Sequence, residues 1–245
     1  MKDINTSAFA IEVVDLVKKF GNFTANDHLT FNVRRGEIFG FLGANGAGKT
    51  TAIKILCGLM APTSGQVVVA GYNVMTHPEL VKQNIGYMSQ KFSLYEDLTI
   101  FENIRLYGAI YGLTANEIRQ RSDTILRKLG LLKDRSRLIK TLSLGWKQKL
   151  AFSVAMVHHP KIVFLDEPTS GVDPVTRRQF WELIYEAAAD GITIFVTTHY
   201  LDEAEYCDRV TVMVDGHIKA LDTPAKLKKQ FNVDTMNEVF LNLTR

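Results

Sequence analysis

One stretch decides the fold of this chain: Gly43-Ala44-Asn45-Gly46-Ala47-Gly48-Lys49-Thr50. It follows the apolar run Ile38-Phe39-Gly40-Phe41-Leu42, and an apolar-periodic segment begins directly after it. The sequence therefore predicts a strand, a glycine-rich turn and a helix, the setting in which G-x-x-x-x-G-K-[ST] marks a phosphate-binding loop. Glycines let the turn bring backbone N–H groups against a polyphosphate, and the helix start adds unpaired amides and a positive dipole end. The flanking strand and helix disfavour the alternative, a glycine-rich turn without a ligand.

Two side chains of this stretch have specific expected roles. Lys49 can reach the β- and γ-phosphates of a nucleoside triphosphate, and Thr50 can offer its hydroxyl to Mg²⁺. We therefore expect a nucleoside triphosphate and magnesium to bind here.

Composition limits the function classes. The chain has 245 residues, of which 46% are hydrophobic, enough for one core or a core with a smaller satellite. Its net charge of +3 is too small to indicate a nucleic-acid partner. Cys57 and Cys207 are too few for a disulfide framework. No apolar run approaches the roughly 18 residues of a membrane span, and residues 1–6 do not form a signal peptide. Any membrane role is therefore expected to need a partner.

The rest of the chain alternates strands with helices, as in an α/β protein. Between about 92 and 157 the pattern becomes helical, and Thr99 with Glu102 and Thr114 with Glu117 fit capping boxes. From Thr223 on, a basic helix is expected, followed by the segment 236–243. Strands are expected at 11–17, 29–33, 38–42, 66–70, 85–88, 161–167 and 192–196, with a hairpin of 210–214 and 217–221 around Asp215-Gly216.

Polar residues follow several expected strands at their carboxyl ends, the edge of an α/β sheet where ligands bind. Gln90 follows the strand 85–88, and it is equally well interpreted as a surface glutamine. Asp166 and Glu167 end an apolar strand; the first is suited to hold Mg²⁺ through water and the second to polarise an attacking water. The nearby phosphate loop favours this over a pair of solvated turn acids. His199 follows another buried strand, which favours contact with a γ-phosphate over a structural role.

Three more residues have a local interpretation. Phe20 is either a core aromatic or a platform on which a flat base stacks, and its spacing alone favours the core. Ser143 is a plausible N-cap for a helix that runs to about Val157. Asp173 is expected to cap the helix that Pro174 begins.

Taken together, these residues resemble the ATP-binding cassette (ABC) ATPases, the motor subunits of ABC transporters, along nearly the whole chain. The resemblance makes Phe20 the adenine-stacking aromatic and replaces the core interpretation. It implies a P-loop NTPase (RecA-like) core with an antiparallel β subdomain and an inserted α-helical subdomain. The matching motifs are the Walker A loop at 43–51, the Q-loop at Gln90, the signature at 142–148, Walker B at 162–167, the D-loop at 170–173 and the switch histidine His199.

The resemblance also implies a domain layout and a set of site residues. The cassette spans 1–245, with an α/β core and β subdomain at 1–90 and 158–222, a helical subdomain at 91–157 and a tail at 223–245. The catalytic residues are Lys49, Gln90, Glu167 and His199, and the magnesium site is formed by Thr50, Gln90 and Asp166. ATP contacts are implied for Phe20, Gly43, Asn45, Gly46, Ala47, Gly48, Lys49, Thr50, Thr51, Ser143, Gly145 and Asp173.

In this family two cassettes close head to tail, so that each ATP lies between the Walker A loop of one and the signature of the other. The family signature begins Leu-Ser-Gly-Gly-Gln, whereas this chain has Leu142-Ser143-Leu144-Gly145-Trp146. Leu144 adds a side chain where a glycine allows close backbone approach to phosphate. Two interpretations remain open: a tolerated variant, or an ATP site in the partner that this signature serves poorly, which would suit a pair of non-identical cassettes.

The amino-acid sequences of the Walker A loop and of residues 197–205 are similar to those of bacterial exporters of drugs and lipids. In such exporters the transmembrane permease subunits are separate chains and the cassettes lie on the cytoplasmic face of the membrane. The second cassette is either identical to this one or different from it. Some exporters carry both cassettes in one tandem chain, and this sequence would then be one half of such a chain. The segment from Gln90 to Leu98, with Phe92, Leu94 and Tyr95, would form the groove for a coupling helix.

Three other functions are possible for a chain with these motifs, and the sequence disfavours each of them. A soluble ABC ATPase acting on the ribosome or nucleic acid would show two cassettes and a charged linker, so no direct nucleic-acid contact is expected. A chromosome-maintenance ATPase would need a long coiled coil between residues 51 and 142, and no sustained heptads occur there. A non-catalytic regulator is disfavoured because Lys49, Asp166, Glu167 and His199 are all intact.

Overall fold

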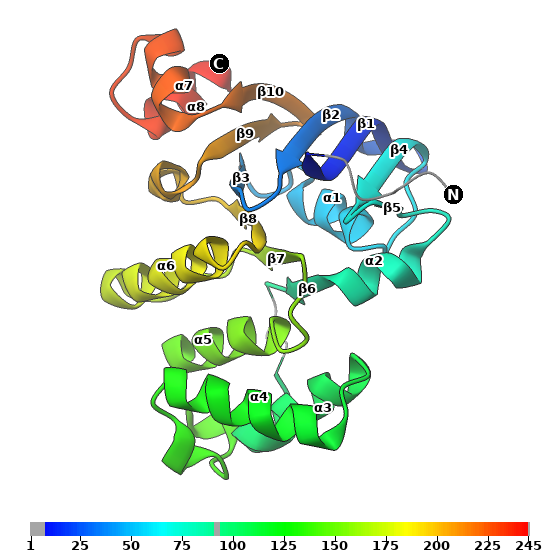
Figure 1. The fold of residues 1–245 in the computed structure, drawn as a ribbon. Helices are drawn as coiled ribbons and strands as arrows, with labels where there is room; N and C mark the ends of the chain where they lie inside the picture. Colours follow the sequence, from blue (N-terminus) through cyan, green and yellow to red (C-terminus); the bar gives the residue numbers. More distant parts are fainter. Residues whose placement is uncertain (1–7, 91–93, 245) are drawn as a thin grey trace.

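The computed structural model of the chain describes residues 8–90 and 94–244. Its strands are β1 (Phe9–Phe20), β2 (Phe23–Arg34), β3 (Ile38–Gly43), β4 (Ser64–Val69), β5 (Tyr72–Asn73), β6 (Ile85–Met88), β7 (Ile162–Asp166), β8 (Thr193–Thr198), β9 (Arg209–Val214) and β10 (His217–Asp222). They form a four-stranded sheet in the order β2-β1-β4-β5 and a six-stranded sheet in the order β10-β9-β3-β8-β7-β6 (Figure 1).

The four-stranded sheet is antiparallel throughout, which confirms the expected β subdomain. The strand β1 is longer than predicted, because its pairing with β2 continues to Phe20 opposite Phe23. Gly21 in the turn between them has φ +56°, the left-handed conformation that glycine adopts without strain. This pairing places Phe20 at the very end of a strand.

The six-stranded sheet is parallel from β9 through β6, and only the edge strand β10 runs antiparallel. Both faces of this sheet are buried, as its nearly continuous apolar strands predict. In β3, Phe39 and Phe41 contact the core on one side, whereas Ile38 and Leu42 contact the core on the other. The carboxyl ends of the parallel strands therefore meet at one edge of a rigid, fully covered sheet.

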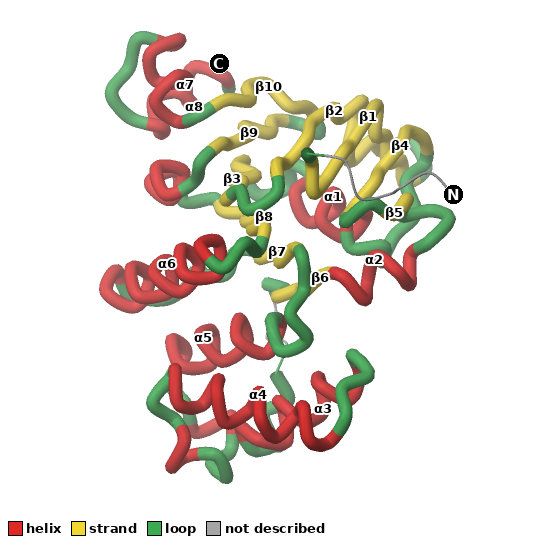
Figure 2. The backbone as a smooth tube through the Cα atoms, viewed as in Figure 1, coloured by secondary structure: helices red, strands yellow, loops and turns green. Residues whose placement is uncertain are grey.

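Helices cover the six-stranded sheet and extend away from it. They are α1 (Lys49–Leu56), α2 (Pro78–Asn84), α3 (Ile100–Ile110), α4 (Ala115–Lys128), α5 (Leu144–Ala155), α6 (Pro174–Ala189), α7 (Pro224–Phe231) and α8 (Met236–Leu243), with 3₁₀ turns η1 (Leu132–Asp134), η2 (Ile139–Thr141) and η3 (Leu201–Tyr206). The helix α1 lies between the two sheets, while α3 and α4 lie at the far end of the molecule (Figure 1). Figure 2 shows the strands in the upper part of the molecule and α3, α4 and α5 in the lower part.

The capping residues of the helical segment are as predicted. Both Thr99 and Thr114 form complete capping boxes with the glutamates three residues later. The helix α2 was not predicted, because it has only seven residues and begins at Pro78 without an apolar period. No helix among residues 8–90 and 94–244 is long and apolar enough to cross a membrane. Phe92, assigned above to a coupling groove, lies outside the described residues.

Candidate nucleotide-binding site

The glycine-rich turn connects the end of β3 to the start of α1 and is held by β2. Gly48 has φ +98°, and a Cβ atom added there would lie 2.2 Å from the carbonyl oxygen of Ala25. The buried Asn26 donates from Nδ2 to the carbonyl oxygen of Gly48 at 3.1 Å. A glycine is therefore required at this position both by its φ angle and by the close approach of β2.

Lys49 folds back across this turn. Its Nζ donates to the carbonyl oxygens of Gly43 at 2.7 Å and Ala44 at 3.1 Å, and lies 3.6 Å from Oε1 of Glu167. The ammonium group is buried, and burial lowers the pKa of Lys49; the nearby Glu167 carboxylate only partly offsets this. A buried cation that bonds to backbone carbonyls is well placed to exchange them for the oxygens of an anionic phosphate.

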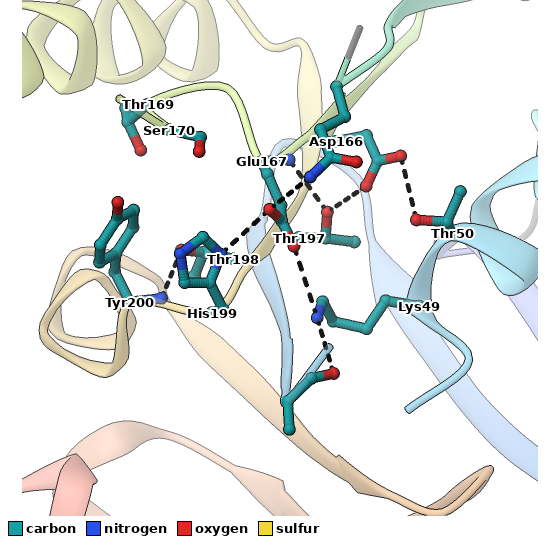
Figure 3. Close-up of polar contacts among 12 residues, drawn as sticks. Lys49, Thr50, Asp166, Glu167, Thr169, Ser170, Thr197, Thr198, His199 and Tyr200 are labelled. Carbon is teal, nitrogen blue, oxygen red and sulfur yellow. Dashed lines mark hydrogen bonds and ion pairs between the residues drawn. The ribbon is translucent and has the colours of Figure 1, made fainter. Parts of the chain in front are cut away.

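Asp166 ends β7 with its carboxylate between two threonines (Figure 3). Thr197 donates from Oγ1 to Oδ1 of Asp166 at 2.7 Å, and Thr50 donates from Oγ1 to Oδ2 at 3.3 Å. Burial raises the pKa of Asp166, because ionisation leaves a negative charge in a poorly solvated site. A buried carboxylate next to a hydroxyl is the oxygen-donor set that Mg²⁺ accepts when phosphates and waters complete its shell. These residues therefore fit a magnesium ion.

Glu167 turns away from Asp166 and has its own partners. Its φ of +49° is the left-handed conformation, which is rare for a residue other than glycine and concentrates at functional sites. Gln90 donates from Nε2 to Oε2 of Glu167 at 2.8 Å, and Nδ1 of His199 lies 3.0 Å from the same oxygen (Figure 3). The two adjacent acids thus have separate contacts, while the negative charge of Glu167 still helps to raise the pKa of Asp166.

The structure brings together the four predicted catalytic residues at one edge of the sheet. They come from α1, from the segment after β6, and from the ends of β7 and β8: Lys49, Gln90, Glu167 and His199. Gln90 is exposed, as a surface glutamine would be, and its amide also contacts the Glu167 carboxylate, as expected of a residue at the ligand edge of the sheet.

The other predicted nucleotide contacts lie at the end of β1 and in the phosphate-binding turn itself. Phe20 is 47% exposed at the end of β1, with Lys18 Nζ 5.0 Å from its ring centre, so the core interpretation is wrong. Asn45, Gly46, Ala47 and Thr51 belong to the turn and the first turn of α1, and a Cβ at Gly43 would lie 2.7 Å from the carbonyl oxygen of Met213.

The signature residues lie at the start of α5. Ser143 is the N-cap residue, as predicted, but its hydroxyl makes no capping hydrogen bond. Leu144 is 42% exposed and lines a small cavity together with Gln90 and Glu167. A Cβ on Gly145 would meet Thr176 at 2.5 Å.

The D-loop ends at the start of α6. Asp173 accepts hydrogen bonds from the backbone N–H groups of Val175 and Thr176, which confirms it as the cap of α6.

Two residues of the site were not predicted to contribute to it. Asn26 supports Gly48 from β2, and Thr197 bonds to Asp166 while its oxygens also accept from the backbone N–H of Glu167. Thr197 lies two positions before His199, at the carboxyl end of β8. Its position in the sequence therefore already indicated that it lies at the edge of the sheet where the site is. Asn26 gives no such signal, because its contact depends on the packing of one sheet against the other.

Comparisons with known proteins agree with this geometry. Residues 26–170 match the family described as ABC transporter. The chain is 47% identical over 238 residues to the probable multidrug ABC transporter ATP-binding protein YbhF of Escherichia coli (strain K12), covering 95% of this chain and 41% of that protein. The chain therefore spans less than half of that relative's length.

Two solved structures are similar over most of their length. The ATP-binding subunit of an ABC transporter has a TM-score of 0.86 and 34% identity, with 96% of this chain and 100% of that chain covered. The ATP-binding cassette MJ0796, solved as a dimer bound to ADP and Pi after hydrolysis, has a TM-score of 0.78 and 25% identity, with 87% and 98% covered.

Proposed function

The chain belongs to the ABC transporter family, and on that premise we propose that it is the ATP-binding and ATP-hydrolysing motor of an exporter. Separate transmembrane subunits would carry the substrate, and the cassette would lie against them on the cytoplasmic face. The observation that supports hydrolysis most strongly is the contact of Glu167 with Gln90, Lys49 and His199 around a phosphate-binding turn.

Binding begins at the turn. The triphosphate takes the backbone N–H groups of residues 43–48 and the start of α1, and Lys49 exchanges the carbonyls of Gly43 and Ala44 for phosphate oxygens. Phe20 is exposed and available to stack on the base. Magnesium, held by Thr50 and Asp166 with Gln90 nearby, would supply charge neutralisation on the phosphates.

Hydrolysis depends on Glu167 and on how it is held. Its carboxylate accepts a proton from the attacking water, while the Gln90 amide and the His199 ring fix its orientation. His199 would also contact the transferring phosphoryl group and stabilise its charge. Such catalysis rests on positioning and charge stabilisation more than on covalent chemistry.

A second cassette would complete the site. Ser143 leaves its hydroxyl unused as a cap, and the first amides of α5 have no intrahelical acceptor, so this helix end can contact the γ-phosphate held by a partner. Leu144 has an ordinary position at the first residue of α5, and we infer that it is a tolerated variant of the signature. The partner is a second ABC cassette, identical or non-identical.

A groove of about 390 Å³ supports a transmembrane partner. It is lined by the side chains of Leu59, Tyr87, Ile110 and Tyr111, among others, and it ends at Ser89 beside Gln90. Leu59 and Ile110 are large exposed apolar residues. An apolar helix from a membrane subunit would fill this groove and contact the segment that carries Gln90.

Co-purification tests this function against its rival. The tagged full chain is expressed in its native host, and detergent-solubilised membranes and pelleted ribosomes are both probed for it. We expect the chain in the membrane fraction with a multi-span protein, and ATPase activity that the Glu167→Gln variant lacks. Recovery with ribosomes alone would instead indicate a soluble ABC ATPase and refute the transport function.

A further inference from the structure

A buried carboxylate lies outside the catalytic cluster but contacts the segments on either side of it. Glu203, in η3, is fully buried four residues after His199. Thr169, two residues after Glu167, donates from Oγ1 to Oε1 of Glu203 at 2.5 Å. Figure 3 shows Thr169 on the loop that follows Glu167. This bond therefore joins the loop after Walker B to the segment after the switch histidine.

Arg177 adds a second connection from α6. Its Nε lies 3.5 Å from Oε1 of Glu203, and its guanidinium carbon lies 4.2 Å from the centre of the Tyr200 ring. The Tyr200 ring in turn lies 4.2 Å from the ring of His199. Because Arg177 follows Asp173 by one helical turn, the same side chain links the start of α6 to the neighbour of His199.

This network is not optimised for stability alone. Among the described residues, Oε2 of Glu203 and Nε of Arg177 are buried without a hydrogen-bond partner. Buried charge pairs with incomplete hydrogen bonding contribute little to stability, and well-packed apolar groups often replace them without loss. We therefore explain the Arg177–Glu203 pair by how it holds the loop after Glu167 and the segment after His199, rather than by a gain in stability.

We propose that Arg177 and Glu203 are a positioning pair for ATP hydrolysis: Glu203 anchors the loop after Glu167 through Thr169, and Arg177 holds His199 through the Tyr200 ring. The inference rests on the proposed function, because it assigns these residues to the hydrolytic step. Neither side chain contacts the phosphate turn. Their loss therefore affects turnover and leaves the binding of ATP unchanged.

The test is a double-mutant cycle between Glu203 and His199. Glu203→Gln keeps the shape and an acceptor for Thr169 but removes the Glu203 charge that faces Arg177, while the Asp202 carboxylate, 3.4 Å from Nη1 of Arg177, stays in place. Glu182→Gln is the matched control, since Glu182 is an exposed carboxylate on α6 that pairs with Arg178 at 3.8 Å. Single-turnover hydrolysis and KM for ATP are measured for each variant, in the wild-type and the His199→Ala backgrounds.

We expect Glu203→Gln to lower kcat about tenfold with KM for ATP within about twofold, and to have less than a twofold effect once His199 is alanine. Arg177→Met is expected to behave in the same way. An equal loss in both backgrounds, a rise in KM alone, or turnover like that of Glu182→Gln would overturn the positioning role. An inactive wild-type protein would instead refute the proposed function itself, so the two failures are distinguishable.

Discussion

The close approach of β2 to the phosphate-binding turn gives a prediction that can be worked from distances. In the Gly48→Ala variant the new methyl group would lie 2.2 Å from the carbonyl oxygen of Ala25 and 2.7 Å from Nδ2 of Asn26. Either β2 or the turn must then move, which costs about 1–3 kcal/mol as overpacking. The φ of +98° adds about 1–2 kcal/mol for a residue with a Cβ. We therefore expect the free energy of unfolding to fall by about 2–5 kcal/mol.

Gly130→Ala is the matched control, because Gly130 has φ +70° and nothing within 4 Å of an added Cβ. Gly130→Ala should lower the free energy of unfolding only by the contribution of the left-handed backbone conformation, about 1–2 kcal/mol. Urea unfolding followed by circular dichroism measures both variants, and calorimetric titration with Mg²⁺ and ATP measures binding. Gly48→Ala should also weaken ATP binding at least about tenfold, because a displaced turn loses a charge-assisted hydrogen bond to phosphate. Equal stability of the two variants, with wild-type ATP affinity for Gly48→Ala, would refute the reasoning.

Three further predictions follow from single residues. Asp166→Asn should raise the free energy of unfolding of the nucleotide-free protein at neutral pH, because burial raises the pKa of Asp166 and the ionised carboxylate destabilises the fold above that pKa. The same substitution should lower ATPase turnover at least about a hundredfold, and an active variant would contradict the role of Asp166. His158 donates from Nε2 to the carbonyl oxygen of Ile85 at 3.0 Å and stacks on Tyr111, and burial lowers its pKa to about 4. Its stabilising effect is therefore complete above pH 6.5 and is lost as the pH falls toward 4, by about 2 kcal/mol at pH 5, and urea melts of His158→Phe should lack this part of the pH dependence. Leu144→Gly should change kcat by less than about threefold, as for an exposed residue that keeps helical geometry; a rise above tenfold would show that the signature variant limits hydrolysis.

Much of the catalytic edge could be predicted because it depends on local sequence. Asp166 ends a buried strand, and Glu167 and His199 directly follow one. Lys49 begins the helix after the turn that leaves a third buried strand, and parallel strands bring their carboxyl ends to one edge. The capping boxes of α3 and α4 are likewise local, since each needs only a threonine and a glutamate three residues apart.

The contacts that could not be predicted join segments far apart in the chain. For Phe20, spacing alone favoured the core and only the family resemblance replaced that interpretation; the end of a strand that pairs into a tight turn leaves the ring exposed. Asn26 bonds to Gly48 only because one sheet packs on the turn that leaves the other. Thr169 and Glu203 are brought together by the neighbouring strands β7 and β8, and neither residue type marks a site by itself.

The central claim is that two nucleotide-bound cassettes pair across ATP and separate after its hydrolysis. Size-exclusion chromatography with light scattering tests it on the Glu167→Gln protein, with its natural partner cassette added where the two differ. We expect a shift from one copy to a pair when Mg²⁺ and ATP are added, none with ADP, and no turnover. A protein that stays single in ATP and hydrolyses it at the wild-type rate would show that the cassettes do not pair across ATP.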